Sequence, residues 1–261
     1  PMNVLKFGGT SVANAQNISL VKNIVQQNTY KKQYVIVSAL GGVTDLLLET
    51  AASAAHQDPQ YKIPLNEIEK RHLDTVKSLI PTNDQAGILS QIKAALNTLE
   101  TLLEGAFLIG EITPKLSDKI VSFGELLSSY IISAYFKSQG LDALHTDART
   151  LITTDQLHGK ATVNYPLTNQ KLKAFNGDNK NAIVVMGGFI ASSTDGVATT
   201  LGRGGSDFTA AIVAAALDAV LLEIYTDVSG MFTANPKLVK QARPITSISY
   251  EEAMELSHFG A

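Results

Sequence analysis

Two charged residues stand next to glycines, where their charge could meet a bound anion. Lys6 lies in the apolar run NVLKF, shortly before Gly8 and Gly9, and Arg203 lies inside the turn LGRGGSD. A lysine at the end of a buried strand is costly to bury without an anion nearby. Lys6 is therefore either half of a structural ion pair, for example with Asp207, or a point charge on a phosphate that is being transferred.

Glycine-rich turns of one design recur along the chain. An apolar strand runs into glycines and then a helix in KFGGTS (6–11), SALGGVT (38–44) and LGRGGSD (201–207), and MGGFIAS (186–192) lacks the helix. Glycines let the backbone approach a ligand, and helix N-termini offer unpaired N–H groups and partial positive charge. Together these turns favour an anionic ligand. The motifs GxxxxGK[ST] and GxGxxG are absent, which argues against a P-loop enzyme and an ordinary dinucleotide binder.

The polar residues near these turns each allow more than one role. Asp207, at a helix start, could cap the helix together with Ser206, orient a neighbouring ammonium, or do both. Glu125 follows a glycine in the mostly apolar SFGELLSS, so its carboxylate is either exposed at a groove or paired with a cation such as a substrate amine. Arg203 could grip a carboxylate with two parallel hydrogen bonds. Arg203 and Glu125 together would select a small amino acid.

The elements that must position these residues alternate between strand and helix. Strands are predicted at NVLKF, QYVIVSAL, LDALHTD, NAIVVMGGFIAS, VATT and AVLLEIY. Helical spacing of apolar residues predicts helices at TSVANAQNISLVKNIVQQ, GGVTDLLLETAASAA, LSDKIVSFGELLSSYIISAYFKSQG and FTAAIVAAALDA. This order predicts the α/β class, as a three-layer αβα sandwich with a mainly parallel central sheet. In such a sheet the turns meet at the carboxyl ends of the strands, where ligands bind.

A helical stretch interrupts this alternation. Between residues 56 and 114, LNEIEKRHLDTVKSLI and DQAGILSQIKAALNTLETLLEGAFLIG both predict amphipathic helices. We interpret this stretch as a helical insertion within a single domain of residues 1–261. The stretch ISYEEAMELSHFGA predicts a final helix, with Ser249 and Glu252 in capping-box spacing.

Composition excludes several classes of function. Of the 261 residues, 45% are hydrophobic and 17% charged, and the net charge is −3 without a basic run. Nucleic acid is not an expected partner, because neutralising phosphates needs clustered Lys and Arg. The lack of cysteine excludes disulfides and thiolate zinc sites, and the scattered histidines have no metal-ligand spacing. The longest apolar tract contains Asp218 and is shorter than the roughly 20 residues that span a bilayer. We expect a cytoplasmic protein without a membrane partner.

Four stretches resemble the aspartokinase family, of the amino acid kinase superfamily: KFGGTSV, GGFIAS, TLGRGGSD and TDVSGMFTANP. They follow one another in the family's order over essentially the whole chain. TSVANA and SISYEEAMELSHFGA most resemble the kinase portion of bifunctional aspartokinase–homoserine dehydrogenases. The resemblance implies that ATP and L-aspartate give ADP and 4-phospho-L-aspartate, the first step towards lysine, threonine and methionine. It also implies an amino acid kinase-like fold, with Mg²⁺ carried mainly on the nucleotide phosphates.

The same resemblance assigns roles to individual residues. Lys6 would contact the transferring phosphate, and Asp207 would hold that lysine in position. The residues that would line the phosphate path are Gly8, Gly9, Gly204 and Gly205. Those that would hold aspartate are Thr44, Glu125, Phe189, Arg203 and Ser206, with Glu125 on the α-amino group and Arg203 on a carboxylate. Those that would bind the nucleotide are Thr226, Asp227, Gly230, Phe232 and Lys237.

The chain departs from the family pattern in its nucleotide-binding stretch. Phe232 replaces a usual Tyr, Lys237 a usual Arg and Asn235 a usual Asp, which we expect to tune nucleotide affinity. Family members continue past FGA with a lysine-containing segment that touches the nucleotide, and then with regulatory domains and, in some, a dehydrogenase. We therefore expect a truncated catalytic domain with reduced activity, which would contact the C-terminal domains of its parent chain. The apolar helices leave room for a homodimer.

Two alternatives stay open. One is another enzyme of the same fold that acts on acetylglutamate, glutamate or carbamate. The other is a ligand-sensing module without turnover, against which the presence of Lys6, Arg203, Ser206 and Asp207 argues for the parent protein.

Overall fold

The computed structural model describes residues 1–228 and the backbone of residues 239–244. Its strands are β1 (Met2–Phe7), β2 (Lys32–Val37), β3 (Ala143–Thr146), β4 (Thr153–Thr154), β5 (Ile183–Gly187), β6 (Ile190–Ser193), β7 (Ala198–Thr200), β8 (Leu221–Tyr225) and β9 (Val239–Pro244). Its α-helices are α1 (Ala15–Gln27), α2 (Val43–Ala55), α3 (Lys62–Leu79), α4 (Gln85–Ile109), α5 (Pro114–Ser138), α6 (Tyr165–Asp178) and α7 (Gly205–Ala216). None of the helices in these ranges is both long and apolar enough to cross a membrane.

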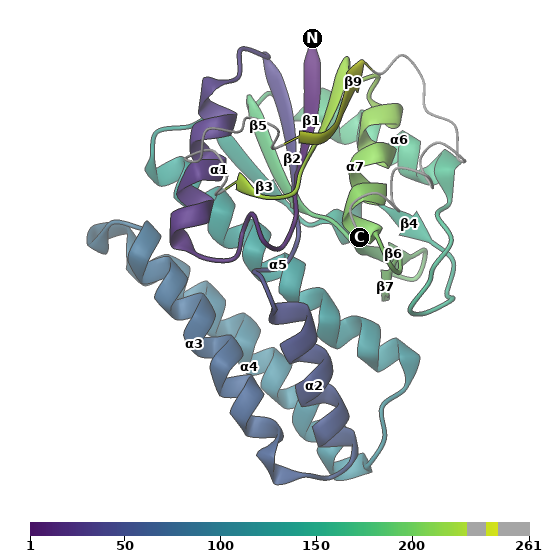
Figure 1. Ribbon diagram of the computed structural model, residues 1–261. Helices are drawn as coiled ribbons and strands as arrows, with labels where there is room; N and C mark the ends of the chain where they lie inside the picture. The colour runs from purple at the N-terminus through teal and green to yellow at the C-terminus, as the bar shows by residue number, and fades with distance from the viewer. Residues whose placement is uncertain (229–238, 245–261) are drawn as a thin grey trace.

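Six strands form the main sheet in the order β3-β5-β2-β1-β8-β9 (Figure 1). The pairs from β3 to β8 are parallel, and β9 pairs antiparallel with β8. β1 lies in the middle, where Lys6 is in register with Ile36 of β2 and Ile224 of β8. The prediction of an α/β fold with a mainly parallel sheet is confirmed. The parallel arrangement brings the turns after β1, β2 and β5 to one edge of the sheet.

Side chains alternate between the two faces of this sheet and separate two hydrophobic cores. Leu5 and Phe7 of β1 lie in the core that includes α1 and α5, whereas Val4 lies in the core that includes α7. Lys6 stands two residues after Val4, so its side chain is on the α7 side of the sheet. Strand alternation therefore directs this ammonium towards the start of α7.

Helices α2, α3 and α4 pack on one another and on α5 as a helical lobe below the sheet in Figure 1. Helices α3 and α4 are the two that the sequence predicts between residues 56 and 114. Helix α2 also joins the lobe, and it begins directly at the SALGGVT turn. The lobe is thereby linked to one of the glycine turns. The assignment of residues 1–261 to a single catalytic domain stays a prediction.

Two parts of the fold differ from the sequence-based expectation. The segment NAIVVMGGFIAS, expected as a strand that runs into a double glycine, forms β5 in the main sheet and then β6 in a second sheet with β4 and β7. Gly188 lies between them, where a Cβ would come 2.7 Å from Cα of Ser206. Helix α6 was not predicted, although Asn164 caps it and Pro166 stands in its first turn. The predicted final helix lies outside the described residues.

Candidate active site

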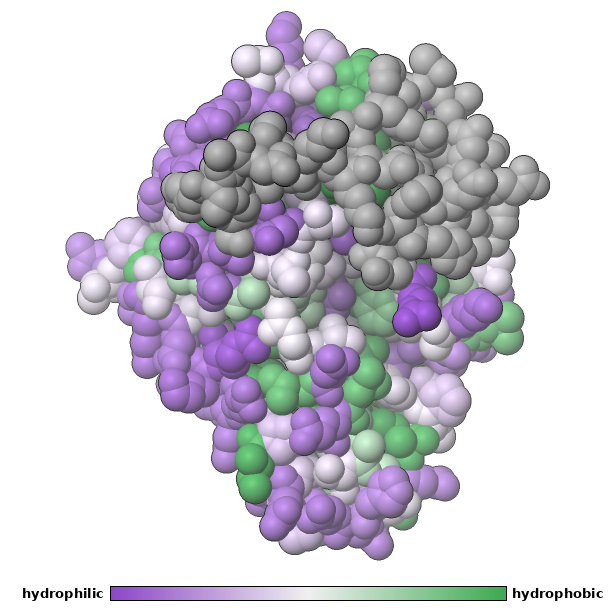
Figure 2. Space-filling view, in the orientation of Figure 1, coloured by the Kyte–Doolittle hydropathy of each residue, from purple (hydrophilic) through white to green (hydrophobic). Residues whose placement is uncertain are grey.

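The turns after the central strands β1, β2 and β5, together with the LGRGGSD turn after β7 of the second sheet, enclose a cleft of about 680 Å³. The predicted site residues that line it are Lys6, Gly8, Gly9, Thr44, Glu125, Phe189, Arg203, Gly204, Gly205, Ser206, Asp207 and Thr226. Asp227 is described but does not line the cleft, and Gly230, Phe232 and Lys237 lie outside the described residues. Residues of intermediate hydropathy, white in Figure 2, gather between the sheet and the helical lobe. The fold thus brings together residues from the four glycine turns.

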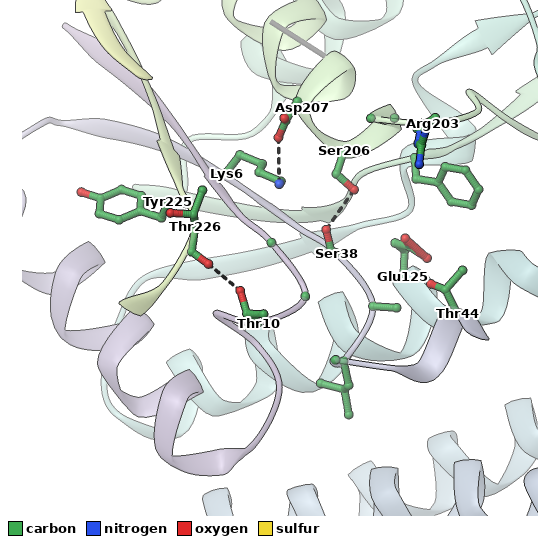
Figure 3. A pocket seen from close by; sticks show the side chains of 18 of the residues that line it. Lys6, Thr10, Ser38, Thr44, Glu125, Arg203, Ser206, Asp207, Tyr225 and Thr226 are labelled. Carbon is green, nitrogen blue, oxygen red and sulfur yellow. Dashed lines mark hydrogen bonds and ion pairs between the residues drawn. The ribbon is translucent and has the colours of Figure 1, made fainter. Parts of the chain in front are cut away.

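Lys6 and Asp207 form a buried ion pair in this cleft. The ammonium lies 2.8 Å from Oδ1 of Asp207, and the two side chains are 7% and 1% exposed (Figure 3). Neither carboxylate oxygen of Asp207 makes a well-directed hydrogen bond to another described residue, so charge alone ties it to Lys6. The ion pair that the sequence allowed is therefore present, and Lys6 still faces the cleft.

Two helix N-termini open onto the cleft without side-chain caps. Helix α7 follows Gly204, at φ 72°, and α2 follows Gly42, at φ 82°, and neither cap position makes a side-chain hydrogen bond. The capping role considered for Asp207 and Ser206 is wrong, because Gly204 is the N-cap, the Asp207 oxygens bond no backbone N–H and the Ser206 hydroxyl pairs with Ser38. Free first-turn N–H groups and the helix dipole make both ends suitable for an anion.

The glycines of the turns are needed because other groups occupy the space of a side chain. A Cβ on Gly8 would lie 3.2 Å from Nζ of Lys6, and one on Gly41 would lie 2.9 Å from the carbonyl oxygen of Gly9. A Cβ on Gly205 would lie 2.8 Å from the ring of Phe189. These glycines therefore let three turns pack closely against neighbouring groups around the cleft.

Glu125 projects into the cleft wall from α5, where it is buried and not exposed at a groove. It is 3% exposed, its Oε1 has no hydrogen-bond partner among the described residues, and no described cation pairs with it. Its burial follows from two glycines, since a Cβ on Gly187 would lie 2.7 Å from Cβ of Glu125 and one on Gly124 would lie 2.9 Å from Cβ of Ala39. Burial raises the pKa of Glu125 to about 8, against the opposing effect of backbone hydrogen bonds. An approaching ammonium would find here an acceptor that lacks a partner.

Arg203 and Phe189 complete this side of the cleft. Arg203 is exposed, and within residues 1–228 no carboxylate lies at ion-pair distance from it. Phe189 adopts φ 71°, which is strained for a residue with a side chain. Its N–H donates to Oγ1 of Thr209 at 3.0 Å, and its carbonyl oxygen accepts from the N–H of Leu201 at 2.9 Å. These bonds hold the phenyl ring against Gly205.

Some lining residues were missed from the sequence. The hydroxyl of Ser38 donates to that of Ser206 at 3.1 Å, and Oγ of Ser128 donates to the carbonyl oxygen of Ser38 at 2.7 Å. Ser38 begins the SALGGVT turn, so that motif could have indicated it. Tyr225 also lines the cleft and stacks on Phe7, with ring centroids 4.8 Å apart. No sequence signal indicates Tyr225, because its place depends on the pairing of β8 with β1.

The cleft has two chemically different ends. In Figure 3, Lys6, Asp207 and Thr226 lie on one side of the Ser38–Ser206 hydrogen bond. Glu125, Thr44 and Arg203 lie on its other side. One end thus offers a lysine and the uncapped N-terminus of α7 for an anion, and the other offers opposite charges for a zwitterion. Within the described part of the chain, no three His, Asp or Glu side chains are grouped so as to hold a metal.

Known proteins are similar to this chain in sequence and in fold. The sequence matches the amino acid kinase family over residues 1–261. It is 35% identical over 259 residues to the chloroplastic bifunctional aspartokinase/homoserine dehydrogenase 2 of Zea mays, covering 99% of this chain and 28% of that protein. It is 34% identical over 262 residues to the aspartokinase of Chlamydia pneumoniae, covering 99% of this chain and 54% of that one. The chain thus spans only part of the length of these relatives.

Solved structures agree with these relatives. E. coli aspartokinase III in complex with aspartate and ADP (R-state) has a TM-score of 0.81 at 31% identity, covering 99% of this chain and 56% of that one. The aspartate kinase of Clostridium acetobutylicum has a TM-score of 0.70 at 30% identity, covering 99% and 55%.

Proposed function

This chain belongs to the amino acid kinase family, and from that premise we propose that it transfers the γ-phosphoryl group of ATP to the side-chain carboxylate of L-aspartate. The products are ADP and 4-phospho-L-aspartate. The observation that carries the proposal is the two-ended cleft, with Lys6 at one end and Glu125 with Arg203 at the other. The E. coli aspartokinase III structure, described as a complex with aspartate and ADP, supports the same pair of ligands.

The reaction asks for positioning and positive charge more than for acid–base catalysis. At neutral pH the side-chain carboxylate of aspartate is already ionised, so it can attack without a general base. A bond forms between a carboxylate oxygen and the γ-phosphorus, and the bond from that phosphorus to the bridging oxygen of ADP breaks. Negative charge is spread over the phosphoryl oxygens in the transition state. The Lys6 ammonium, held by Asp207, and the N–H groups at the start of α7 would stabilise that charge.

The substrate end accounts for the selection of an amino acid. Glu125 would receive the α-ammonium group of aspartate, and the guanidinium of Arg203 would bind a carboxylate with two hydrogen bonds. Thr44, Ser206 and Phe189 would line the remaining surface. A phosphoryl acceptor that lacks an α-ammonium group would leave the buried Glu125 without a partner.

The nucleotide would enter at the end that Thr226 lines, and Mg²⁺ would come with it. Because the described residues offer no ready cage of three carboxylates or histidines, the fit is to a metal held mainly by the phosphates. Bound there, Mg²⁺ would neutralise phosphate charge. Binding by Asp227, Gly230, Phe232 and Lys237, a cytoplasmic location, a homodimer and contacts with C-terminal domains stay predictions.

Trapping the product tests the proposal most directly. The purified protein is incubated with ATP, Mg²⁺, L-aspartate and hydroxylamine, which converts an acyl phosphate into a hydroxamate, while ADP release is followed in a coupled assay. We expect both signals with L-aspartate, neither without Mg²⁺, and much weaker signals with L-glutamate, N-acetylglutamate or carbamate. If the protein preferred one of those acceptors, that acceptor and not aspartate would be its substrate. Calorimetric binding of aspartate without any ADP release would instead indicate a sensing module.

A further inference from the structure

A second carboxylate on α5, which the proposed chemistry does not use, is buried below the substrate end of the cleft. Asp118 is 3% exposed and lies in the first turns of the helix that also carries Glu125. Oδ1 accepts a hydrogen bond from Oγ1 of Thr200 at 2.7 Å, and Oδ2 accepts one from Nδ1 of His158 at 2.8 Å. The N–H of Gly159 donates to both oxygens, at 3.1 and 3.0 Å. Every acceptor position of this buried charge is therefore directed at a neighbouring segment.

These bonds tie two segments to α5. One is the 155–160 turn, which carries His158 and Gly159. The other is the end of β7, where Thr200 also accepts a hydrogen bond through its carbonyl oxygen from the N–H of Ala161 at 2.9 Å. Thr200 directly precedes the LGRGGSD turn that bears Arg203.

The two segments also touch next to Arg203 itself. Gly202 has φ 81°, and a Cβ there would lie 3.4 Å from the carbonyl oxygen of Gly159. The backbone of the Arg203 turn therefore lies beside the backbone that Asp118 and His158 hold in place, close enough that a side chain on Gly202 would contact it. Movement of Gly159 would change the space beside Gly202.

The position of Asp118 relative to Glu125 is fixed because both residues lie on α5. Asp118 and Glu125 are seven residues apart on one helix, which places them on the same face about 10 Å apart along the axis at 1.5 Å per residue. One rigid helix thus carries Glu125 directly and anchors the turn of Arg203 through Asp118. The separation of the two groups that would bind the amino acid is therefore set by α5.

We propose that Asp118 and His158 are positioning residues that fix Arg203 relative to Glu125 and so determine the affinity for the amino acid substrate. The inference rests on the proposed function for its substrate. His158 donates through Nδ1, so the contact needs a donor at that position and does not need an imidazole. A residue that only stabilised the fold would affect both substrates alike, whereas this pair acts on the amino acid end alone.

Steady-state kinetics on variants of His158 distinguish a role in positioning Arg203 from a role in stability alone. His158→Ala removes the donor, whereas His158→Asn keeps an N–H donor near the position of Nδ1, and the exposed His56 gives a matched control, His56→Ala. We expect His158→Ala to raise the KM for aspartate about tenfold, the effect of losing one hydrogen bond to a charged group. The KM for ATP should change less than twofold, His158→Asn should recover most of the loss, and His56→Ala should match the wild type. Equal increases in both KM values, or a lower Tm with both KM values unchanged, would overturn the proposal.

Amide hydrogen exchange on the unliganded protein tests the anchoring without any activity. His158→Ala should speed exchange at Gly159 and residues 201–205 at least fivefold and leave residues 41–44 unchanged. An unchanged 201–205 segment would reject the anchoring even if the protein phosphorylates aspartate. If the wild type does not use aspartate, the proposed function fails, and the exchange result still decides whether this pair anchors the Arg203 turn.

Discussion

The ammonium of Lys6 and the carboxylate of Asp207 lie 2.8 Å apart and almost completely buried, one at the end of β1 and the other in the first turn of α7. Such a pair has different consequences for stability and for catalysis. Removing one partner leaves an uncompensated buried charge, whereas replacing both by apolar residues is often neutral or stabilising.

Lys6→Met should therefore weaken both folding and turnover. We expect a loss of about 3–5 kcal/mol in the free energy of unfolding from the unpaired Asp207. Turnover should fall at least about 100-fold, because a charge on the transferring phosphate is lost. The double variant Lys6→Met/Asp207→Leu should regain most of the stability in urea unfolding without regaining ADP release. Recovery of activity in the double variant would show that Lys6 is structural only.

Arg203→Ala should affect one substrate only. We expect the KM for aspartate to rise at least about tenfold, as for the loss of a charge-assisted hydrogen bond, while the KM for ATP stays within twofold. Arg149→Ala is a matched control, because that guanidinium pairs with Asp147 at 2.9 Å and does not line the cleft. A selective rise in the KM for ATP would instead place Arg203 at the nucleotide end.

Aspartate binding should release a proton through Glu125. With its pKa raised to about 8 by burial, this carboxyl is mostly protonated at pH 7 in the unliganded protein. An incoming ammonium favours the ionised form, so about one proton should leave per aspartate bound. Calorimetry in buffers of different ionisation enthalpy measures this number. At pH 9 the release should vanish, because the group is then already ionised, and in Glu125→Gln it should be absent at both pH values.

Two Gly→Ala substitutions should change the stability of the protein in opposite directions. In Gly188→Ala the new Cβ would meet Cα of Ser206 at 2.7 Å, and backbone of α7 would have to move. We expect a loss of about 2 kcal/mol or more of stability, together with most of the activity. Gly105→Ala in α4 meets nothing within 4 Å and should add up to about 1 kcal/mol, because alanine favours a helix interior. Thermal unfolding of both variants, with assays at 25 °C, checks the contrast.

Stability should decline below neutral pH because of one buried and one partly buried histidine. Burial lowers the pKa of His72 and of His145 to about 4, well below the usual value for the free side chain. Between pH 6.5 and 4 the unfolded chain therefore binds more protons, so stability falls as the pH falls through this window. His72 should account for at most about 3 kcal/mol of this loss in the free energy of unfolding. In urea unfolding, the stability of His72→Leu should fall less steeply than that of the wild type as the pH is lowered. The variant of the exposed His56, His56→Leu, should lose stability as the wild type does.

Strand and helix order followed from the sequence because it depends on local periodicity. The run NVLKF and the apolar spacing of the helices are short-range signals, and they produced β1 and the expected helices α1 to α5 and α7. The same reasoning placed Lys6 and the first two glycine turns at the ends of parallel strands, which must come to one edge of the sheet. The turn of Arg203 instead follows β7, which pairs antiparallel with β6 in the second sheet, so the parallel strands alone do not explain its place in the cleft. The resemblance to aspartokinases added the roles of Thr44, Phe189 and Thr226, which no spacing indicates.

Tertiary structure decided how these residues face one another. The burial of Glu125 depends on Gly187 of β5 facing Glu125 and on Gly124 of α5 facing Ala39, and the pairing of Asp118 with His158 depends on α5 crossing the 155–160 turn. Neither contact has a local signal, because its partners come from separate elements whose distance is set by packing. The division of residues 183–193 between two sheets has the same cause, since the short run cannot reveal which strand will lie beside it. Residue types and turns were thus determined by the chain's local pattern, and their protonation, pairing and orientation by the packing of distant segments.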